Sequence, residues 1–171
     1  WVEIFNGGSG AIDLSTYKFF EGGVNHGLTL SEGSASLGAG AYAVIADDPT
    51  KFKIDWPSFS GNLFDSSFSL GNTGETLILR DDALVDIDSV TYSSVTGAVG
   101  DGNSLQNGSS GWVAALPTPG GPTSGTSLGG GDGGSGTGDG GGGAGGGSVA
   151  GTSTSVTTQV TSGGGIWTIK L

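Results

Sequence analysis

The stretch TGETLILRDDALVDIDSVTY, residues 73–92, decides the fold class of this chain. Within it, two runs of alternating apolar and polar residues flank a short acidic connection, a pattern that predicts an antiparallel hairpin. Residues 11–20, AIDLSTYKFF, continue the alternation, and similar runs recur at roughly ten-residue spacing from residue 1 to about 119. Glycine-rich turns separate them. The sequence therefore predicts an all-β domain of the sandwich or barrel type.

The same alternation predicts the core, and local signals predict one helix. We expect the core to contain Ile4, Leu14, Val44, Ile45, Leu77, Leu79, Val90 and Trp112. DDPTKFKID, residues 47–55, is the only segment predicted to be helical, because Asp48 can cap a helix and Pro49 fits its first position. The pair Asn107 and Gly108 predicts a type I′ turn between two short strands.

The chain changes character near residue 117, and three parts are expected. Residues 1–119 form the predicted all-β domain. Residues 120–147 contain 17 glycines in 28 positions and one apolar residue larger than alanine, Leu128, so this stretch cannot bury a core and is predicted to be a Pro/Gly-rich linker. Residues 148–171 regain β-forming residues and are predicted to supply a C-terminal strand.

Charge and cysteine content exclude several kinds of partner and site. With 16 acidic and 5 basic residues the net charge is -11, and no basic patch is available to displace phosphate counterions, so we expect no nucleic-acid partner. The absence of cysteine excludes disulfides and thiolate metal sites. No apolar run approaches the ~18 residues of a membrane span, so we expect no membrane insertion in this segment.

Four segments in order carry a family resemblance. They are WVEIFN…IDLSTYKF, GAYAVIADDP, FSLGNTGETLILRD…DSVTY and GNSLQ…GWVAALPTPGGP. Together they closely resemble the lamin tail domain family, most of all its bacterial secreted or cell-surface members, over roughly residues 1–120. The resemblance implies an immunoglobulin-like β-sandwich that is not catalytic. Such modules lie at the end of eukaryotic nuclear lamins and, in bacteria, occur in exported proteins.

One strand of the family pattern has no counterpart in this sequence. Family members carry a strand with an Ile-Asn-Glu-like motif before the segment that resembles residues 1–6, whereas this chain opens on that segment, without an initiator Met. We therefore expect a processed protein or, in preference, part of a longer one. A sandwich without that strand leaves backbone N–H and C=O groups unpaired beside an apolar groove, and such an edge invites another strand.

The C-terminal segment IWTIKL, residues 166–171, is the predicted occupant of that edge. Its alternation lets one apolar face enter a groove. We expect it to pair with the domain of a neighbouring copy rather than with its own, although the connection is long enough for either. The predicted self-assembly residues are Ile166, Trp167, Thr168, Ile169 and Leu171 on the donor and Trp1, Val2 and Ile4 on the acceptor.

The sequence contains no recognisable catalytic constellation, and we predict a protein that is not an enzyme and has no cofactor. His26, the only histidine, lies among turn glycines and is predicted to be on a surface loop, without a nucleophile signature such as GxSxG. Glu3 and Glu75 lie within separate strands, so a glycosidase-type carboxylate pair is not expected. The glycosylation sequon at Asn107 is explained by the predicted turn without a glycan.

Two further binding hypotheses are weaker. The acidic hairpin connection offers oxygen atoms for calcium, which takes about six to eight of them, but a solvated turn is the preferred interpretation, because the glycine and terminal glutamate of an EF-hand loop are missing. The calcium candidates are Asp81, Asp82, Asp86 and Asp88. A carbohydrate-stacking set of tryptophans is a minor alternative, since Trp1 and Trp112 are predicted to be in the core and only Trp56 to be exposed.

These expectations combine into one predicted function. We expect a non-enzymatic structural protein of the cell surface or extracellular space that assembles with copies of itself into a filament by strand donation, since head-to-tail exchange does not close on itself. The alternative is a tethered adhesion or binding module in which the glycine-rich stretch is a plain linker to a further domain.

Overall fold

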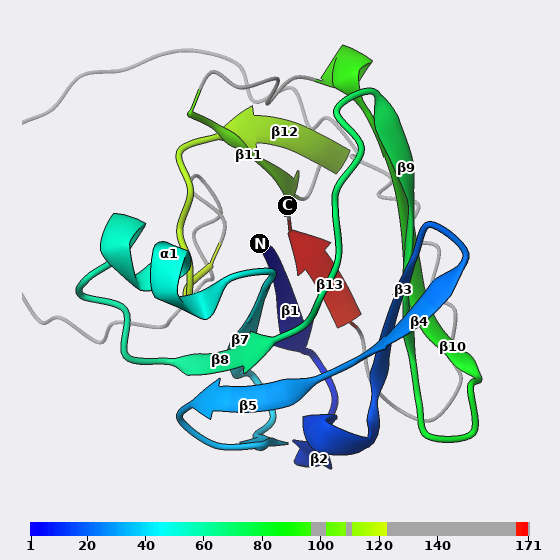
Figure 1. Ribbon diagram of the computed structural model, residues 1–171, viewed down its shortest axis with the longest axis vertical. Helices are drawn as coiled ribbons and strands as arrows, with labels where there is room; N and C mark the ends of the chain where they lie inside the picture. Colours follow the sequence, from blue (N-terminus) through cyan, green and yellow to red (C-terminus); the bar gives the residue numbers. More distant parts are fainter. Residues whose placement is uncertain (97–101, 109–110, 123–166, 171) are drawn as a thin grey trace, which may run out of the picture.

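The computed structural model describes residues 1–96, 102–108, 111–122 and 167–170. Most of the regular structure in these ranges is β-strand, so the predicted all-β class is confirmed (Figure 1). The elements are β1 (Val2–Asn6), β2 (Ile12–Asp13), η1 (Leu14–Thr16), β3 (Lys18–Glu21), β4 (Val24–Gly27), β5 (Thr29–Glu32), β6 (Ser36–Leu37), β7 (Tyr42–Ala46), α1 (Pro49–Asp55), β8 (Asn62–Asp65), β9 (Gly74–Arg80), β10 (Asp86–Ser93), η2 (Ser94–Thr96), β11 (Ser104–Gly108), β12 (Gly111–Ala115) and β13 (Trp167–Lys170).

One sheet has five strands in the order β13-β1-β7-β8-β5. Its strands are antiparallel except for β7 and β8, which are parallel and therefore need a crossover connection. The short helix α1 lies in that connection. Asp48 caps it by accepting a hydrogen bond from Lys51 N at 3.0 Å, and Pro49 is its first residue. The predicted helix and its cap are thus confirmed.

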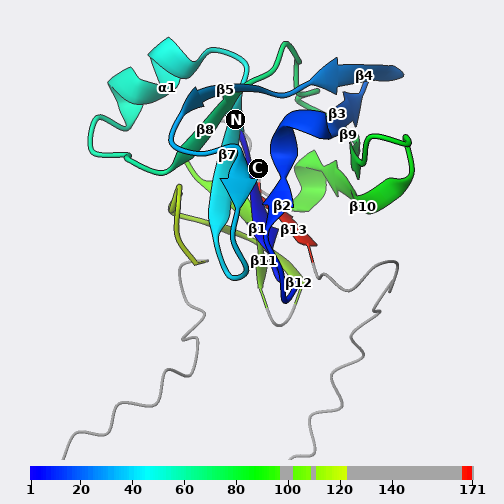
Figure 2. The same ribbon diagram turned by 90° about the horizontal axis from the view of Figure 1, so that it is seen from below.

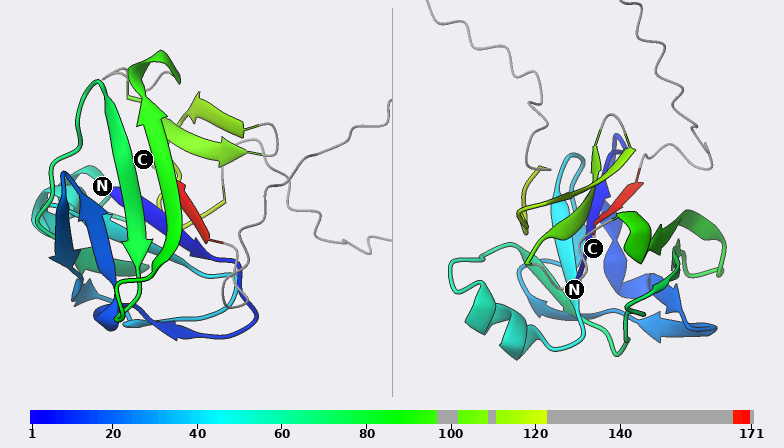
Figure 3. Two further views of the ribbon diagram at one scale, coloured as in Figure 1. Left: turned by 90° about the vertical axis from the view of Figure 1, so that its right-hand side faces the viewer. Right: turned by 90° about the horizontal axis from the view of Figure 1, so that it is seen from above.

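A second sheet has the order β10-β9-β3-β4 and contains the hairpin predicted from residues 73–92. Strands β9 and β10 are antiparallel, with Leu77 opposite Val90 and a bulge between Asp86 and Asp88. Figure 3 shows these two long strands beside the shorter β1 and β13. Two small two-stranded sheets, β11-β12 and β2-β6, complete the architecture.

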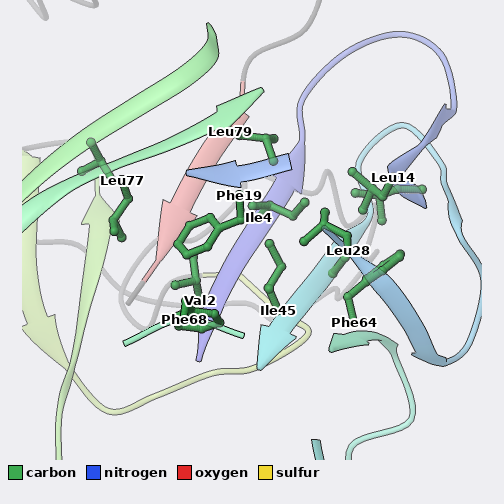
Figure 4. Packing of buried hydrophobic residues seen from close by; sticks show 13 residues of the cluster. Val2, Ile4, Leu14, Phe19, Leu28, Ile45, Phe64, Phe68, Leu77 and Leu79 are labelled. Carbon is green, nitrogen blue, oxygen red and sulfur yellow. The ribbon is translucent and has the colours of Figure 1, made fainter. Parts of the chain in front are cut away.

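Side chains from both large sheets form one buried cluster. Figure 4 shows side chains from β1, β3, β7 and β9 meeting in the space between the strands. The cluster consists of Val2, Ile4, Leu14, Phe19, Leu28, Leu37, Ala43, Ile45, Phe64, Phe68, Leu77, Leu79 and Val90. Trp112 packs against it, and Val44 is buried in a second cluster, so every predicted core residue is confirmed as buried or packed against the core.

The second cluster covers the opposite face of β7 and is built around α1. It contains Val44, Ala46, Phe52, Phe59 and Leu63. The ring of Trp1 lies 5.9 Å from that of Phe52 and 6.4 Å from that of Trp56, both edge-to-face. Trp56 is half-buried in this contact, so the prediction that it is exposed is wrong. Since Trp112 packs against the other cluster, Trp1, Trp56 and Trp112 do not form one sugar-stacking set.

The strand predicted over residues 11–20 is interrupted. Residues 14–16 form the 3-10 turn η1 instead, because Asp13 caps it by accepting a hydrogen bond from Ser15 N at 3.0 Å. This side-chain acceptor lets the backbone leave the strand while Leu14 stays buried. The core prediction for Leu14 is therefore correct although its secondary structure is not.

The turn predicted at Asn107 and Gly108 is also misplaced. Both residues lie in β11, where Asn107 pairs with Trp112 and Gly108 pairs with Gly111. The connection between β11 and β12 falls two residues later, at 109–110, outside the described residues. The sequon at Asn107 therefore lies in a strand rather than in a tight turn.

The predicted linker, residues 120–147, lies almost entirely outside the described residues, as does most of the C-terminal segment 148–171. Before the gap, the described residues end in a turn in which Gly121 N donates a hydrogen bond to Thr118 O at 3.1 Å. It resumes at β13. Figure 2 shows that this strand returns to the side of β1.

Candidate functional site

The segment predicted to donate a strand forms one, and it lies where the open edge was expected. Strand β13 pairs antiparallel with β1, so β1 lies between β13 and β7 (Figure 1). The register places Trp167 opposite Asn6, Thr168 opposite Phe5, Ile169 opposite Ile4 and Lys170 opposite Glu3. Ile166 and Leu171, the other two predicted donor residues, lie outside the described residues. We call β1 and its β13-facing backbone the acceptor edge.

The acceptor belongs to the same chain, so the prediction that the strand pairs with a domain other than its own is wrong for the chain described here. The connection, residues 123–166, has 44 residues, and a sequence so rich in glycine reaches about 35 Å root-mean-square. A tethered strand meets its own acceptor at an effective concentration in the millimolar range, whereas a second copy is present only at the bulk concentration. Pairing in cis therefore prevails in dilute protein.

The acceptor strand is held by its side chains on both faces. Val2 and Ile4 point into the main core, with exposed fractions of 0% and 1%. Trp1 packs against the second cluster beside Phe52. Because both faces are anchored, β1 offers its partner a fixed row of backbone donors and acceptors.

Between these apolar residues, Glu3 is a fully buried carboxylate with an exposed fraction of 0%. Its Oε2 accepts a hydrogen bond from Gly120 N. Burial raises the pKa of the nearby Tyr42 phenol, and the negative charge of Glu3 raises it further. The register places Lys170 opposite this buried acid. Sequence reasoning predicted neither the burial of Glu3 nor the register that places Lys170 opposite it. One signal was present, since Lys170 is the only basic residue after Arg80.

Comparison with known proteins supplies no function for the acceptor edge. No family model, curated protein or solved structure matches this chain. The resemblance to the lamin tail domain family therefore remains an expectation from the sequence. Function has to be argued from the residues of this chain.

The prediction that His26 lies on a surface loop is wrong. His26 lies in strand β4 and is mostly buried. The hairpin of β3 and β4 pairs it with Phe19 and brings its Nε2 to 3.3 Å from Glu21 Oε1. The same Glu21 oxygen accepts a hydrogen bond from Ser69 N at 3.1 Å. His26 thus lies beside the connection between β8 and β9, and the hairpin rather than the glycines beside it determines its position.

Three carboxylates hold the connection between β8 and β9, which carries the chain from one sheet to the other. Besides Glu21, Asp47 accepts a hydrogen bond from Phe68 N at 3.2 Å, and Glu75 accepts one from Gly71 N. Tyr92 O–H donates to the same Glu75, and burial together with that carboxylate raises the pKa of Tyr92. Glu75 and Glu3 belong to different sheets and accept hydrogen bonds from different backbone groups.

The four calcium candidates are engaged separately. Asp81 accepts a hydrogen bond from Val85 N at 2.8 Å and closes the hairpin connection, and Asp86 lies 2.6 Å from Arg80 Nε. Asp88 accepts a hydrogen bond from Ser89 N, and Asp82 is exposed. In the described part of the chain, no three acidic or histidine side chains lie close enough together to hold a metal ion. The exposed Asp82 fits the solvated-turn interpretation, whereas Asp86 and Asp88 lie in β10 and Asp88 is partly buried.

Asp88 provides a testable pH dependence. Burial raises the pKa of its carboxyl from 3.8 to about 6, so the folded protein retains a proton that the unfolded chain has already released. Stability contributed by this group is present at low pH and is lost as the pH rises from about 4 to about 6. Asp88→Asn should therefore raise the free energy of unfolding at neutral pH by about 1 kcal/mol, after allowing for solvent screening at a half-exposed site.

Urea unfolding at several pH values measures this effect. The gain from Asp88→Asn should shrink toward zero as the pH falls below about 4. Asp82→Asn, at an exposed position in the connection that precedes β10, is the matched control and should not reproduce the gain of Asp88→Asn. A gain from Asp88→Asn that is the same at all pH values would contradict the assignment.

Membrane insertion was not expected from the sequence. Within the described ranges, none of the helices has the length and apolar character that a membrane span needs.

Proposed function

We propose that this chain is a non-enzymatic structural module of the extracellular space or cell surface, with an immunoglobulin-like sandwich of the lamin-tail type completed by its own last strand. The observation that carries the proposal is the pairing of β1 with β13 across a connection of 44 residues. A strand held on so long a connection can dock on its own acceptor or on that of another copy with the same contacts. When β13 docks on the acceptor of another copy, the two copies are linked.

Closure in cis changes how assembly has to proceed. An empty acceptor would bind a donor as soon as two copies met, whereas a closed chain must first release β13. Assembly is then slow and steeply dependent on concentration, because a second copy must compete with the tethered strand. Once opened, each copy donates one strand and accepts one, and this head-to-tail arrangement extends into a filament.

The alternative, an adhesion module with a plain linker, draws on one feature of the surface. A shallow groove of about 400 Å³ lies between β5 and α1 and is lined by Ser31, Glu32, Pro49, Thr50, Lys53, Ile54 and Leu63. However, a plain linker to a further domain would not bring the chain back to β1, as β13 does. We therefore favour the structural module.

Strand exchange can be tested by disulfide trapping, since the chain has no cysteine of its own. Phe5 and Thr168 are opposite each other in the register, and directly opposed residues have Cβ atoms about 4.5–5.5 Å apart, close to what a disulfide needs. One copy with Phe5→Cys is mixed with another carrying Thr168→Cys. We expect a disulfide between the two copies at high protein concentration and very little of it in dilute solution.

Two controls define the test. A single chain with both Phe5→Cys and Thr168→Cys should form the disulfide within itself at any concentration. Phe5→Cys mixed with Lys170→Cys is two residues out of register, at about 7–8 Å, and should not be linked. If the single chain closes but the mixture never links, and negative-stain images show no filaments, β13 is a permanent part of its own domain and the assembly proposal is wrong.

A further inference from the structure

The connection between β9 and β10 presents an apolar tip to solvent. It is closed by backbone hydrogen bonds, since Leu84 N donates to Asp81 O and Asp81 N donates to Val85 O, both at 3.1 Å. The Asp81 carboxylate also accepts a hydrogen bond from Val85 N. In this closed turn Leu84 and Val85 have exposed fractions of 52% and 50%. We call residues 82–85 the hairpin tip.

Leu84 has a backbone that does not suit a leucine. Its φ is +61°, and no other residue with a side chain in the described ranges has a positive φ. In the turn between β3 and β4, such angles are taken by Gly22 and Gly23. A left-handed backbone destabilises a residue with a side chain, and glycine is the ordinary choice at such a position of a short hairpin connection. Local folding energetics therefore do not account for Leu84, and an exposed apolar side chain at a strained position points to a contact with another molecule.

The groove between β5 and α1 is complementary to this tip. Its volume is about 400 Å³, and its lining combines apolar residues with a cation. Leu63 in the lining is buried, whereas Ile54 is 73% exposed and offers apolar surface to a partner. Lys53 lines the same groove, and Lys51 lies on the same short helix. The groove thus offers apolar surface beside positive charge.

Charge favours a meeting of these two surfaces. The tip carries the exposed Asp82, next to Asp81, in a chain with a net charge of -11. Two of the five basic residues of the chain lie on α1. Both of these lysines already have acidic neighbours, Asp48 and Glu32, but these pairs are partly exposed to solvent. Exposed ion pairs contribute little to stability, so the ammonium groups can also attract a carboxylate of another molecule.

The two surfaces cannot meet within one chain. Figures 1 and 2 show the connection between β9 and β10 on one side of the domain and α1 on the opposite side. A tip that enters such a groove must therefore belong to a second copy.

We propose that the hairpin tip of one copy docks in the groove between β5 and α1 of a second copy, with its apolar side chains against the apolar lining and its carboxylates toward the lysines of α1. The two surfaces differ and lie on opposite sides, so the contact repeats head to tail. The inference rests on the proposed function in taking a copy of this chain as the partner. It does not need strand exchange, because β13 stays on its own β1. A single tip buries little surface, so the contact is weak and operates between concentrated copies.

The test uses the full chain with Phe5→Cys and Thr168→Cys, oxidised so that β13 is locked on its own β1 and strand exchange is prevented. Sedimentation equilibrium up to about 1 mM suits a contact this small. The average mass of the locked chain should rise with concentration past that of a dimer, as open-ended association requires.

Leu84→Gly in the locked chain should lower the association constant by about tenfold or more, because a leucine leaves the contact. The same replacement should raise the midpoint of thermal unfolding by about 4 °C, because the backbone strain is relieved. Weaker association of a more stable protein excludes unfolding as the cause. Adding Val85→Thr should remove the association that remains.

Complementation identifies the two surfaces. Ile54→Glu in the groove should also abolish association, whereas Leu116→Glu, at a position with the same exposed fraction of 73%, is the matched control and should not. The tip variant with Leu84→Gly and Val85→Thr still has an intact groove, and Ile54→Glu still has an intact tip. Mixed together, the two variants should form dimers and nothing larger, although each alone is monomeric.

The inference is overturned if the locked chain stays monomeric at about 1 mM, which would leave the tip to a different partner. It is equally overturned if Leu84→Gly associates like its parent, or if the mixture of variants forms no dimers. Strand exchange is measured separately by the mixed-copy disulfide. If locked chains associate but mixed copies never link through that disulfide, strand exchange is lost and the tip contact stands.

Discussion

Deleting residues 167–171 is expected to lower the free energy of unfolding by about 4 kcal/mol, since the ladder between β13 and β1 is lost and each hydrogen bond contributes ~1 kcal/mol. For a domain of this size the midpoint of thermal unfolding should fall by more than about 10 °C. The deletion also turns β1 into an open edge next to the buried Ile4, so the truncated protein should aggregate. Calorimetry and light scattering measure the two effects.

Deleting the same number of residues from the connection, 140–144, is the matched control. Closing a slightly shorter loop changes the entropy by only about 0.1 kcal/mol, so this variant should unfold like the parent. A synthetic peptide of residues 163–171 should restore the truncated protein and suppress its aggregation. Truncation without any loss of stability would show that β13 contributes nothing to the folded domain.

Gly74→Ala is expected to have the largest effect of any single replacement discussed here, about 3–5 kcal/mol. Gly74 begins β9 with a φ of +121°, and a Cβ at this position would lie 2.3 Å from the Tyr92 carbonyl oxygen and 2.8 Å from Ser93 Cα. Both obstructing atoms belong to the backbone of the paired strand, so the clash is relieved only by separating β9 from β10.

A glycine that also has a positive φ, but has open surroundings, is the control for the steric clash. Gly22, in the turn between β3 and β4, has a φ of +56° and no atom within 4 Å of a Cβ placed there. Gly22→Ala should cost only about 1–2 kcal/mol, the penalty of a left-handed backbone for a residue with a side chain. Urea unfolding of both variants provides the comparison, and equal losses would contradict the steric explanation.

Much of the fold was predictable because its signals are local. The hairpin over residues 73–92 follows from alternation around an acidic connection, and β7, a continuous apolar run, is buried on both faces. The helix at Pro49 follows from a cap and a proline that few other structures accommodate. The predicted core residues follow from the same patterns.

Where a turn or strand was predicted at the wrong residues, the local sequence is compatible with two backbone conformations of similar energy. Asn107 and Gly108 are good turn residues, but pairing two residues further along aligns β11 with Trp112, which packs against the core. At Leu14, alternation and an Asp13 cap predicted different backbones with the same side chain buried. Tertiary packing determines which conformation forms, and local patterns in a single sequence do not predict it.

The candidate site was predictable in its location but not in its partner. The open β1 edge was implied by the family resemblance, the alternating C-terminal strand is visible in the sequence, and the structure pairs the two. Pairing in cis and in trans uses identical contacts, so only the length of the connection and the protein concentration distinguish them. The opposition of Glu3 and Lys170 depends on the register, which alternation fixes only to within two residues.

Pairing between residues 3 and 170 also sets the order of events during synthesis. β1 is synthesised before β13, its neighbour on one side, and the whole connection between them must be made in the interval. At about 5–20 residues per second, translation of the 44 connecting residues alone takes roughly 2–9 s. For that time the nascent chain has a nearly complete sheet with one unpaired strand, and premature contact between growing chains is a hazard that cis closure then removes.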